Sequence, residues 1–158
     1  MINEIENDLR GIISPKHLLG SWELTVSENL IQIGHVRIIS DDLSRFLGTS
    51  RQVVILASTL GISVDVYLQK LMHTDMAKAV LADNLASKLI EEYVNETQTK
   101  LGIEGKRYSP GYGDFNIKHQ KDLLKILNCE KIGLYMTDSY MLTPSKSITA
   151  ILKTEAIT

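Results

Sequence analysis

The segment Thr74-Asp-Met-Ala-Lys-Ala-Val-Leu-Ala-Asp-Asn-Leu-Ala-Ser-Lys-Leu-Ile-Glu-Glu-Tyr-Val-Asn-Glu-Thr97 carries the strongest periodic signal in the chain. Its apolar residues recur at spacings of three or four and therefore share one helix face. These residues are Ala77, Val80, Leu81, Leu85, Leu89 and Tyr93, and the face is widened by Ala79, Ala82, Ala86 and Ile90. We predict one long helix that begins at Thr74-Asp75, ends near Thr97 and packs on more than one side as the spine of the domain.

The residues before this helix mix extended and helical patterns. Val53–Ala57 is a continuous apolar run, which is typical of a strand covered on both faces. Residues 30–39 are rich in β-branched side chains, and Gly34 marks a bulge or turn between two extended halves. Ser40-Asp41-Asp42 predicts the start of a short helix, since Ser can cap free amides and acids favour this end, and Gly48 can end it.

Three further segments complete the first half of the chain. Asn3–Gly11 predicts a short amphipathic helix, and Val64–Met72 predicts another one just before the long helix. After Ser14-Pro15 the pattern is irregular until Leu24. Trp22, Leu24 and Val26 alternate and predict a short strand.

The second half begins with residues 106–114, which cannot be regular structure because Pro110, Gly111 and Gly113 break both periods. Asp114 is expected to cap a helix that follows it. Apolar residues predict strands at 132–136, 140–142 and 148–152. Together the elements predict a single α+β domain over residues 1–158, with a long central helix and additional helices against the strands.

Composition excludes several classes of protein. With a net charge of −2 and no cluster of Lys and Arg, the chain is not expected to bind nucleic acid. No apolar run approaches the length that spans a bilayer, and the N-terminus lacks the pattern of a signal peptide. The one cysteine, Cys129, leaves no disulfide or iron–sulfur cluster within the chain. We expect a cytoplasmic protein that binds no membrane and has no metal site.

The loop from Arg107 to Asp114 has the chemistry of a small-ligand site. An arginine binds a carboxylate through two parallel hydrogen bonds, and Gly111 allows a ligand to approach the backbone closely. Tyr108 and Tyr112 add flat apolar faces with polar tips. These residues suit a ligand that carries an amino-acid group and a ring. The alternative is a structural turn, with Arg107 in a surface ion pair.

Arg107, Gly111 and Tyr112 stand as Arg-x-x-x-Gly-Tyr, and this pattern resembles the S-adenosylmethionine signature of the activation domain of cobalamin-dependent methionine synthase. The string Arg107-Tyr-Ser-Pro-Gly-Tyr-Gly-Asp114 is similar to that of the family's short, stand-alone forms. Two more segments resemble the family in the same order, Ala57–Gly61 and Met141–Ile148 with its Pro-x-x-Ser. The resemblance covers roughly residues 35–155, implies a mixed or antiparallel curved sheet, and leaves residues 1–30 unmatched.

The resemblance also implies roles for individual residues. Arg107 would hold the carboxylate of S-adenosylmethionine, and the backbone around Ser109 and Gly111 would contact the adenosyl part. Tyr112 would face the corrin ring of a cobalamin bound to a partner. Glu91 would attract the ligand's ammonium group, and its alternative role is that of a solvated helix residue. The family also has an aromatic residue after its closing segment, where this chain has Ile151 and Leu152, so a stacking contact is expected to be missing.

By this resemblance the chain is a module for reductive reactivation, with S-adenosylmethionine as cofactor and cobalamin supplied by a corrinoid-binding methionine synthase or a related corrinoid protein. The reductant would be of the flavodoxin or ferredoxin type. No catalytic residue is expected, because the chain would contribute to a methyltransferase rather than be a complete enzyme. The alternative from another class is a non-catalytic interaction subunit of a corrinoid methyltransferase system with a vestigial ligand site.

Overall fold

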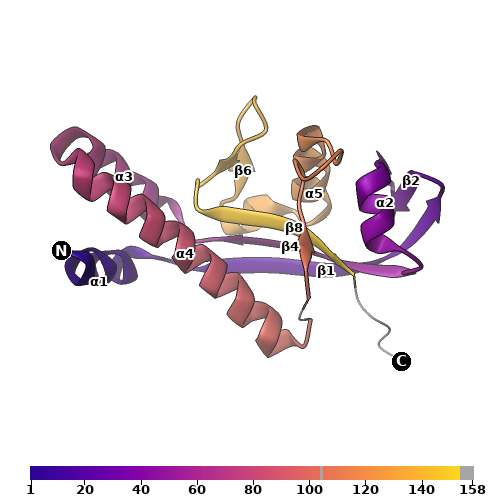
Figure 1. Cartoon of the computed structure of the whole chain (residues 1–158), viewed down its shortest axis with the longest axis horizontal. Coiled ribbons are helices and arrows are strands. Elements are labelled where there is room, and N and C mark those ends of the chain that lie inside the picture. The colour runs from indigo at the N-terminus through magenta and orange to yellow at the C-terminus, as the bar shows by residue number, and fades with distance from the viewer. Residues whose placement is uncertain (104, 154–158) are drawn as a thin grey trace.

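An antiparallel sheet runs through the middle of the molecule in the computed structural model, which describes residues 1–103 and 105–153 (Figure 1). Its strand order is β3-β2-β1-β4-β8-β5. The strands are β1 (Lys16–Ser27), β2 (Leu30–Ile33), β3 (Val36–Ile39), β4 (Gln52–Thr59), β5 (Arg107–Tyr108) and β8 (Ser147–Lys153). A separate pair is formed by β6 (Tyr135–Met136) and β7 (Leu142–Thr143). The predicted α+β class is confirmed, and every pairing in the sheet is antiparallel.

Strand β4 is buried on both faces of the sheet. Val53, Ile55 and Ala57 point into one core, whereas Val54 and Leu56 point into the other. Successive side chains of a strand alternate between faces, so this uninterrupted apolar run needs cover on both sides. The sequence prediction for this strand is therefore confirmed.

The helices divide between the two faces. The core of Val54 and Leu56 is closed by α1 (Ile2–Ile12), α3 (Ile62–Thr74) and α4 (Met76–Leu101), which lie together in Figure 1. The core of Val53 and Ile55 is closed by α2 (Asp41–Leu47) and α5 (Gln120–Ile126). Two short 3₁₀ helices lie beside α5, η1 (Ile117–His119) and η2 (Cys129–Ile132). The buried Cys129 thiol belongs to this second core, and burial raises its pKa to about 12.

The long helix α4 begins as predicted and ends four residues later than Thr97. The Asp75 side chain accepts a hydrogen bond from the Lys78 amide at 3.1 Å and caps its first turn. Gly102 ends it in the left-handed conformation, with φ of 68°. The extra turn begins with Gln98, a polar residue that is 3% exposed and that the apolar pattern could not include.

Several predictions of local structure are wrong. Residues 16–21, expected to be irregular, belong to the same twelve-residue strand β1 as the predicted strand at Trp22, Leu24 and Val26. Gly20 interrupts its apolar pattern because the Trp22 ring lies over the glycine, where an added Cβ would approach the ring to 2.5 Å. The strand expected at 132–136 is reduced to β6, since the 3₁₀ helix η2 extends to Ile132.

Among the helices of residues 1–103 and 105–153, none is long and apolar enough to cross a membrane. Within the same residues, no group of three or more His, Cys, Asp or Glu side chains is placed to hold a metal ion. The prediction of a single domain over residues 1–158 stays a prediction.

Truncation of Leu56 tests the buried centre of the sheet. Leu56 is 0% exposed in the core beneath α4, so Leu56→Ala leaves a cavity and should lower the free energy of unfolding by about 2–5 kcal/mol. Urea denaturation measures the change. The matched control is Leu101→Ala, the same truncation at a side chain that is 49% exposed, where the loss should stay below about 1 kcal/mol. Equal losses would contradict the assignment of β4 as the central strand.

Candidate functional site

The two-residue strand β5 sends its side chains to opposite faces of the sheet. Arg107 extends toward α4, where its Nη1 donates to Asn95 Oδ1 at 2.9 Å and to Gln98 Oε1 at 2.7 Å. Its Nη2 donates to Glu91 Oε2. Tyr108 turns to the other face, where its ring lies 5.1 Å from Phe46. The alternation of a strand thus separates the cation from the aromatic cluster.

Three acceptors for Arg107 lie on one face of α4. Glu91, Asn95 and Gln98 are spaced by four and three residues, which brings their side chains into line. The Arg107 side chain is 17% exposed and the Glu91 side chain is 55% exposed. The ion pair expected under the alternative of a structural turn is therefore present, and its carboxylate remains in reach of solvent.

The loop that follows β5 forms a compact turn. Tyr112 donates its amide to Ser109 O at 3.0 Å, and Gly111 donates its amide to Phe115 O at 2.7 Å. Gly111 has φ of 97°, a conformation that residues with a Cβ rarely adopt. The Ser109 hydroxyl donates to Thr149 O at 2.7 Å and ties the loop to β8. The loop is therefore held against the edge of the sheet at its middle.

The end of the loop is fixed to α2 by reciprocal hydrogen bonds. Asp114 accepts from the amides of Asp41 at 2.9 Å and Asp42 at 3.1 Å, and from the Ser40 hydroxyl. Asp42 returns the contact by accepting from the Asp114 amide at 2.8 Å. The prediction that Asp114 caps the helix after it is wrong, because that position is taken by Asn116 at the start of η1. Asp114 instead supplies acceptors to α2, whose own cap is Ser40.

This junction has a specific electrostatic character. The Ser40 hydroxyl and the two amides of α2 stabilise the charged form of Asp114 and lower its pKa. Burial, together with the nearby carboxylates of Asp42 and Asp114, raises the pKa of Tyr108. No side chain fits at Gly113, where a Cβ would lie 2.2 Å from Asp42 Oδ2 and 2.8 Å from Tyr108 Oη. The junction therefore requires this glycine.

A cavity of about 150 Å³ opens beside the Arg107 side chain. It is lined by Glu91, Arg107, Ser109, Tyr112, Gln120, Leu142, Ser147, Ile148 and Thr149. Four of the five residues proposed from the sequence thus border one pocket: Glu91, Arg107, Ser109 and Tyr112. Gly111 does not line it and serves the turn of the loop.

Of the segments that resemble one family in sequence, two line this cavity and the third, Ala57–Gly61, is bonded to one of them. Thr59, at the end of β4, accepts a hydrogen bond from the Ser147 hydroxyl at 2.7 Å. Leu60 donates its amide to Lys146 O at 2.9 Å. Ser145 is fixed to α3, because its amide and hydroxyl both donate to the Asp65 carboxylate, at 2.9 and 2.8 Å. The closing segment is therefore held by β4 and α3 while it forms one wall of the pocket.

Sequence reasoning missed several residues of the site. Asn95 and Gln98 contact Arg107, and Gln120 and Thr149 line the cavity and bond to each other. Only the spacing of Asn95 and Gln98 from Glu91 along a helix could have indicated them, and that required knowing that Arg107 lies against α4.

Ile151 and Leu152 do not reach the pocket. Ile151 is 0% exposed in the core beneath α5, and Leu152 is 1% exposed in the core beneath α4. No aromatic contact to a ligand can come from these two positions.

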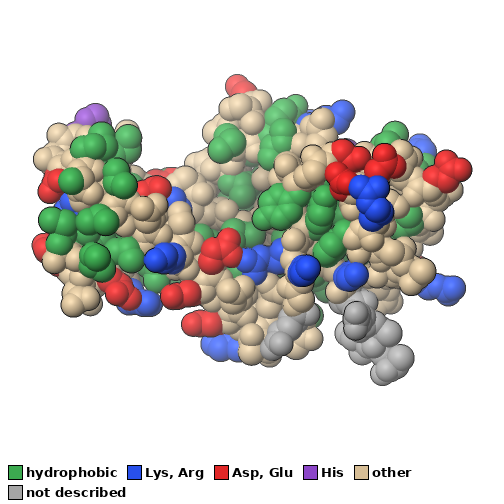
Figure 2. Space-filling view, viewed as in Figure 1, with side chains coloured by type: hydrophobic (Ala, Val, Ile, Leu, Met, Phe, Trp, Pro, Cys, Tyr) green, Lys and Arg blue, Asp and Glu red, His purple; other side chains and the backbone are tan. Residues whose placement is uncertain are grey.

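Exposed apolar side chains lie beside the pocket. Tyr112 is 53% exposed at its edge, and Leu142 of β7 forms another side. The neighbouring segments also expose Ile117, Tyr135 and Met141. Hydrophobic side chains gather over β6, α5 and the segment between them in Figure 2. Burial of these side chains against an apolar partner would be favourable, whereas a polar partner would gain little from them.

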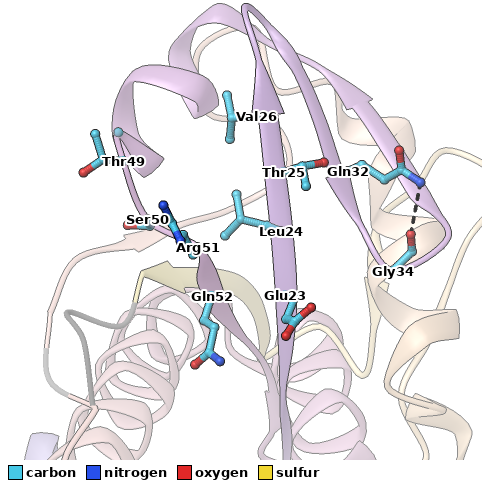
Figure 3. Close-up of a pocket in the computed structure, with 11 residues that line it drawn as sticks. Glu23, Leu24, Thr25, Val26, Gln32, Gly34, Thr49, Ser50, Arg51 and Gln52 are labelled. Atoms are coloured by element: carbon cyan, nitrogen blue, oxygen red, sulfur yellow. Dashed lines mark hydrogen bonds between the residues drawn. The ribbon is translucent and has the colours of Figure 1, made fainter. Parts of the chain in front are cut away.

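A larger hollow lies at the other end of the sheet, between β1, β2 and the segment from Gly48 to Gln52. Figure 3 shows its side chains spread apart rather than converging on a point. Glu23, Thr25, Gln32 and Arg51 on its walls are exposed. It lacks the convergent polar groups of a small-molecule site, so the pocket at Arg107 is the better candidate.

Comparisons with known proteins find one family and a similar solved structure. The family model described as "Vitamin B12 dependent methionine synthase, activation domain" matches residues 43–156. A solved structure described as the MetH reactivation domain bound to AdoHcy is similar, with a TM-score of 0.71 and 17% identity. The match covers 99% of this chain and 65% of that chain, so this chain spans about two thirds of that domain's length. No curated protein matches the chain.

The contact between Asp114 and α2 predicts a stability that depends on pH. Because the pKa of Asp114 is lowered in the folded chain, its contribution is present above the ordinary aspartate pKa and is lost as pH falls through its own lower pKa. Asp114→Asn should therefore be clearly less stable than the wild type near neutral pH, and the difference should shrink in acid. Urea denaturation across pH measures this. A difference that is the same at every pH would contradict the role of the charge.

Proposed function

The chain belongs to the family of vitamin B12-dependent methionine synthase activation domains, and on that premise we propose that it binds S-adenosylmethionine and acts in trans on a separate corrinoid protein. The observation that supports this most is the pocket that brings Arg107 and Glu91 together with Ser109 and Tyr112. The solved relative is described as bound to AdoHcy, which is S-adenosylmethionine after loss of its methyl group.

The two charged residues fit the amino-acid end of this ligand. An α-amino acid carries a carboxylate and an ammonium group on one carbon, so it can meet a guanidinium and a carboxylate that lie side by side. Arg107 Nη2 donates to Glu91 Oε2 when no ligand is bound, so the guanidinium and the carboxylate already lie side by side. In our proposal the ligand's carboxylate takes the place of Glu91 on Arg107, and the released Glu91 accepts from the ammonium.

The remaining surfaces fit the rest of the assembly. Ser109 and Thr149 form the floor on which the adenosyl group would lie, and the exposed Tyr112 ring would face the corrin of the partner's cobalamin. The exposed apolar side chains beside the pocket suit a corrin, which presents a broad flat surface. The chain's own task is to bind and orient the methyl donor, and none of its residues has to move a proton.

In this proposal the partner's cobalamin would supply the acceptor for the methyl group, once reduced by one electron, and this chain would hold the methyl donor and be left with S-adenosylhomocysteine. The electron must come from a separate reductant, and a flavodoxin or ferredoxin would supply one electron at a time. The chain thus acts as a component of a methyltransferase system.

A second function has two observations in its favour. The Arg107 guanidinium is already bonded to three acceptors of α4, and Ile151 and Leu152 offer no aromatic contact. Both facts suit a vestigial site in an interaction subunit that only docks on a corrinoid protein. A ligand that binds the folded chain raises its melting temperature, so an unchanged melting temperature at millimolar S-adenosylmethionine would favour this second function.

Removal of the guanidinium tests the main proposal. Arg107→Ala should weaken S-adenosylhomocysteine binding roughly ten- to hundredfold, as expected for loss of hydrogen bonds to a charged group. Binding of decarboxylated S-adenosylmethionine should change little, because that ligand has no carboxylate. Isothermal titration measures both. Lys106→Ala, which removes an exposed cation next to Arg107, should leave both affinities unchanged. Equal binding of S-adenosylhomocysteine by wild type and Arg107→Ala would show that the site is wrongly assigned.

Glu91→Gln separates the ammonium contact from the carboxylate contact. Loss of the charge should weaken S-adenosylhomocysteine binding by about fivefold, because an exposed charge pair contributes about 1 kcal/mol or less. Methylthioadenosine, which lacks the amino-acid group, should bind as before. The control is Glu92→Gln, the next residue, whose carboxylate is 59% exposed and pairs with Arg10. Tighter binding of S-adenosylhomocysteine by Glu91→Gln would mean that Glu91 only competes with the ligand.

A further inference from the structure

The acceptors around Arg107 are of two kinds. Asn95 and Gln98 offer neutral amide oxygens, and both bind Nη1. Glu91 offers a charged oxygen and binds Nη2. Nε has no hydrogen-bond partner among residues 1–103 and 105–153. The neutral acceptors therefore hold one corner of the guanidinium, and the side made by Nε and Nη2 remains for a carboxylate.

Gln98 is the most constrained of these acceptors. It is 3% exposed, whereas Glu91 and Asn95 are exposed. Its Nε2 donates to Ile103 O at 3.0 Å and to Gly105 O at 3.2 Å. If the amide were turned over, its oxygen would face two carbonyl oxygens and its nitrogen would face a cation. Only one orientation of the Gln98 amide satisfies all its neighbours, so Oε1 is fixed toward Arg107.

From this geometry we propose that Gln98 is the residue that positions Arg107 for the ligand. Its buried amide connects the last turn of α4 to residues 103 and 105, and so joins the helix to the chain that leads into β5. Gln98 fixes the direction of the guanidinium without touching the ligand. The inference rests on the proposed function for its consequence, since an arginine that is aimed in advance loses less freedom when a carboxylate binds.

The neutrality of Gln98 is part of the same inference. A carboxylate at this buried position would form a permanent ion pair with Arg107 and compensate its charge. The exposed Glu91 differs, because water can solvate it when a ligand displaces it. A neutral acceptor inside and a charged acceptor outside therefore leave the attraction of Arg107 available to the ligand's carboxylate.

Two substitutions at Gln98 test both parts with S-adenosylhomocysteine and methylthioadenosine as ligands. Gln98→Met keeps the length of the side chain and removes the acceptor, and we expect S-adenosylhomocysteine to bind roughly tenfold more weakly. Gln98→Glu keeps the acceptor but adds charge, and it should weaken the same ligand at least as much. Methylthioadenosine should bind both variants within about twofold of the wild type, because it makes no contact with Arg107.

The control is Thr97→Val, a neighbouring buried residue whose hydroxyl donates to Tyr93 O of its own helix. It should not change the ratio of the two affinities. Equal weakening of both ligands in the Gln98 variants would mean that Gln98 only supports the fold, and would overturn the proposal.

A readout without ligand separates this inference from the proposed function. Nitrogen NMR of the Arg107 guanidinium should show slow rotation in the wild type and in Thr97→Val, and fast rotation in Gln98→Met. If this pattern holds while no ligand binds, the positioning role stands and the proposed function fails. If Arg107 rotates equally fast in wild type and Gln98→Met, the positioning role is wrong whatever the ligand affinities are.

Discussion

Strand β4 must be covered on both faces, and the rest of the structure follows from that constraint. Its apolar side chains alternate between two cores, so one layer of helices cannot bury them all. The layer of α1, α3 and α4 closes one face, and the layer of α2 and α5 closes the other. The edge strand β5, two places from β4, therefore lies where both layers can be reached.

The candidate site lies at this edge strand and contacts helices of both layers. Arg107 extends from β5 to α4 in one layer, and Asp114, at the end of the same loop, binds α2 in the other layer. Between them Ser109 is tied to β8. A loop fixed at three points to three different elements has little freedom left to lose, so a ligand that binds there costs little ordering entropy. The irregular segment is held more firmly than its lack of regular structure suggests.

The sequence predicts the parts that depend on local pattern. The burial of β4, the start of α4 at Asp75 and the turn at Gly34 follow from periodicity, capping and glycine, and all three are confirmed. Strand β1 was partly missed because Gly20 and Trp22 hide its alternation, and the ring that covers the glycine belongs to the tertiary structure.

The candidate site likewise contains residues that the sequence predicts and residues that it does not. Glu91, Arg107, Ser109 and Tyr112 were predicted from chemistry and resemblance, and they line one pocket, while their roles toward a ligand stay predictions. The acceptors Asn95 and Gln98 could not be predicted, since nothing local shows which helix an arginine will meet. Asp114 was assigned to the wrong helix for the same reason, because a cap can be supplied by a residue distant in sequence.

An arginine that is already bonded need not be a relic. Its side chain is 17% exposed, and a cation removed so far from water requires acceptors at all times, including the time before a ligand arrives. The chain meets this requirement in two ways: a buried amide that stays in place, and an exposed carboxylate that can return to water. If all three acceptors were buried and charged, no ligand could displace one of them at low cost. The division between a fixed neutral partner and an exchangeable charged partner is the arrangement that the proposed carboxylate site requires.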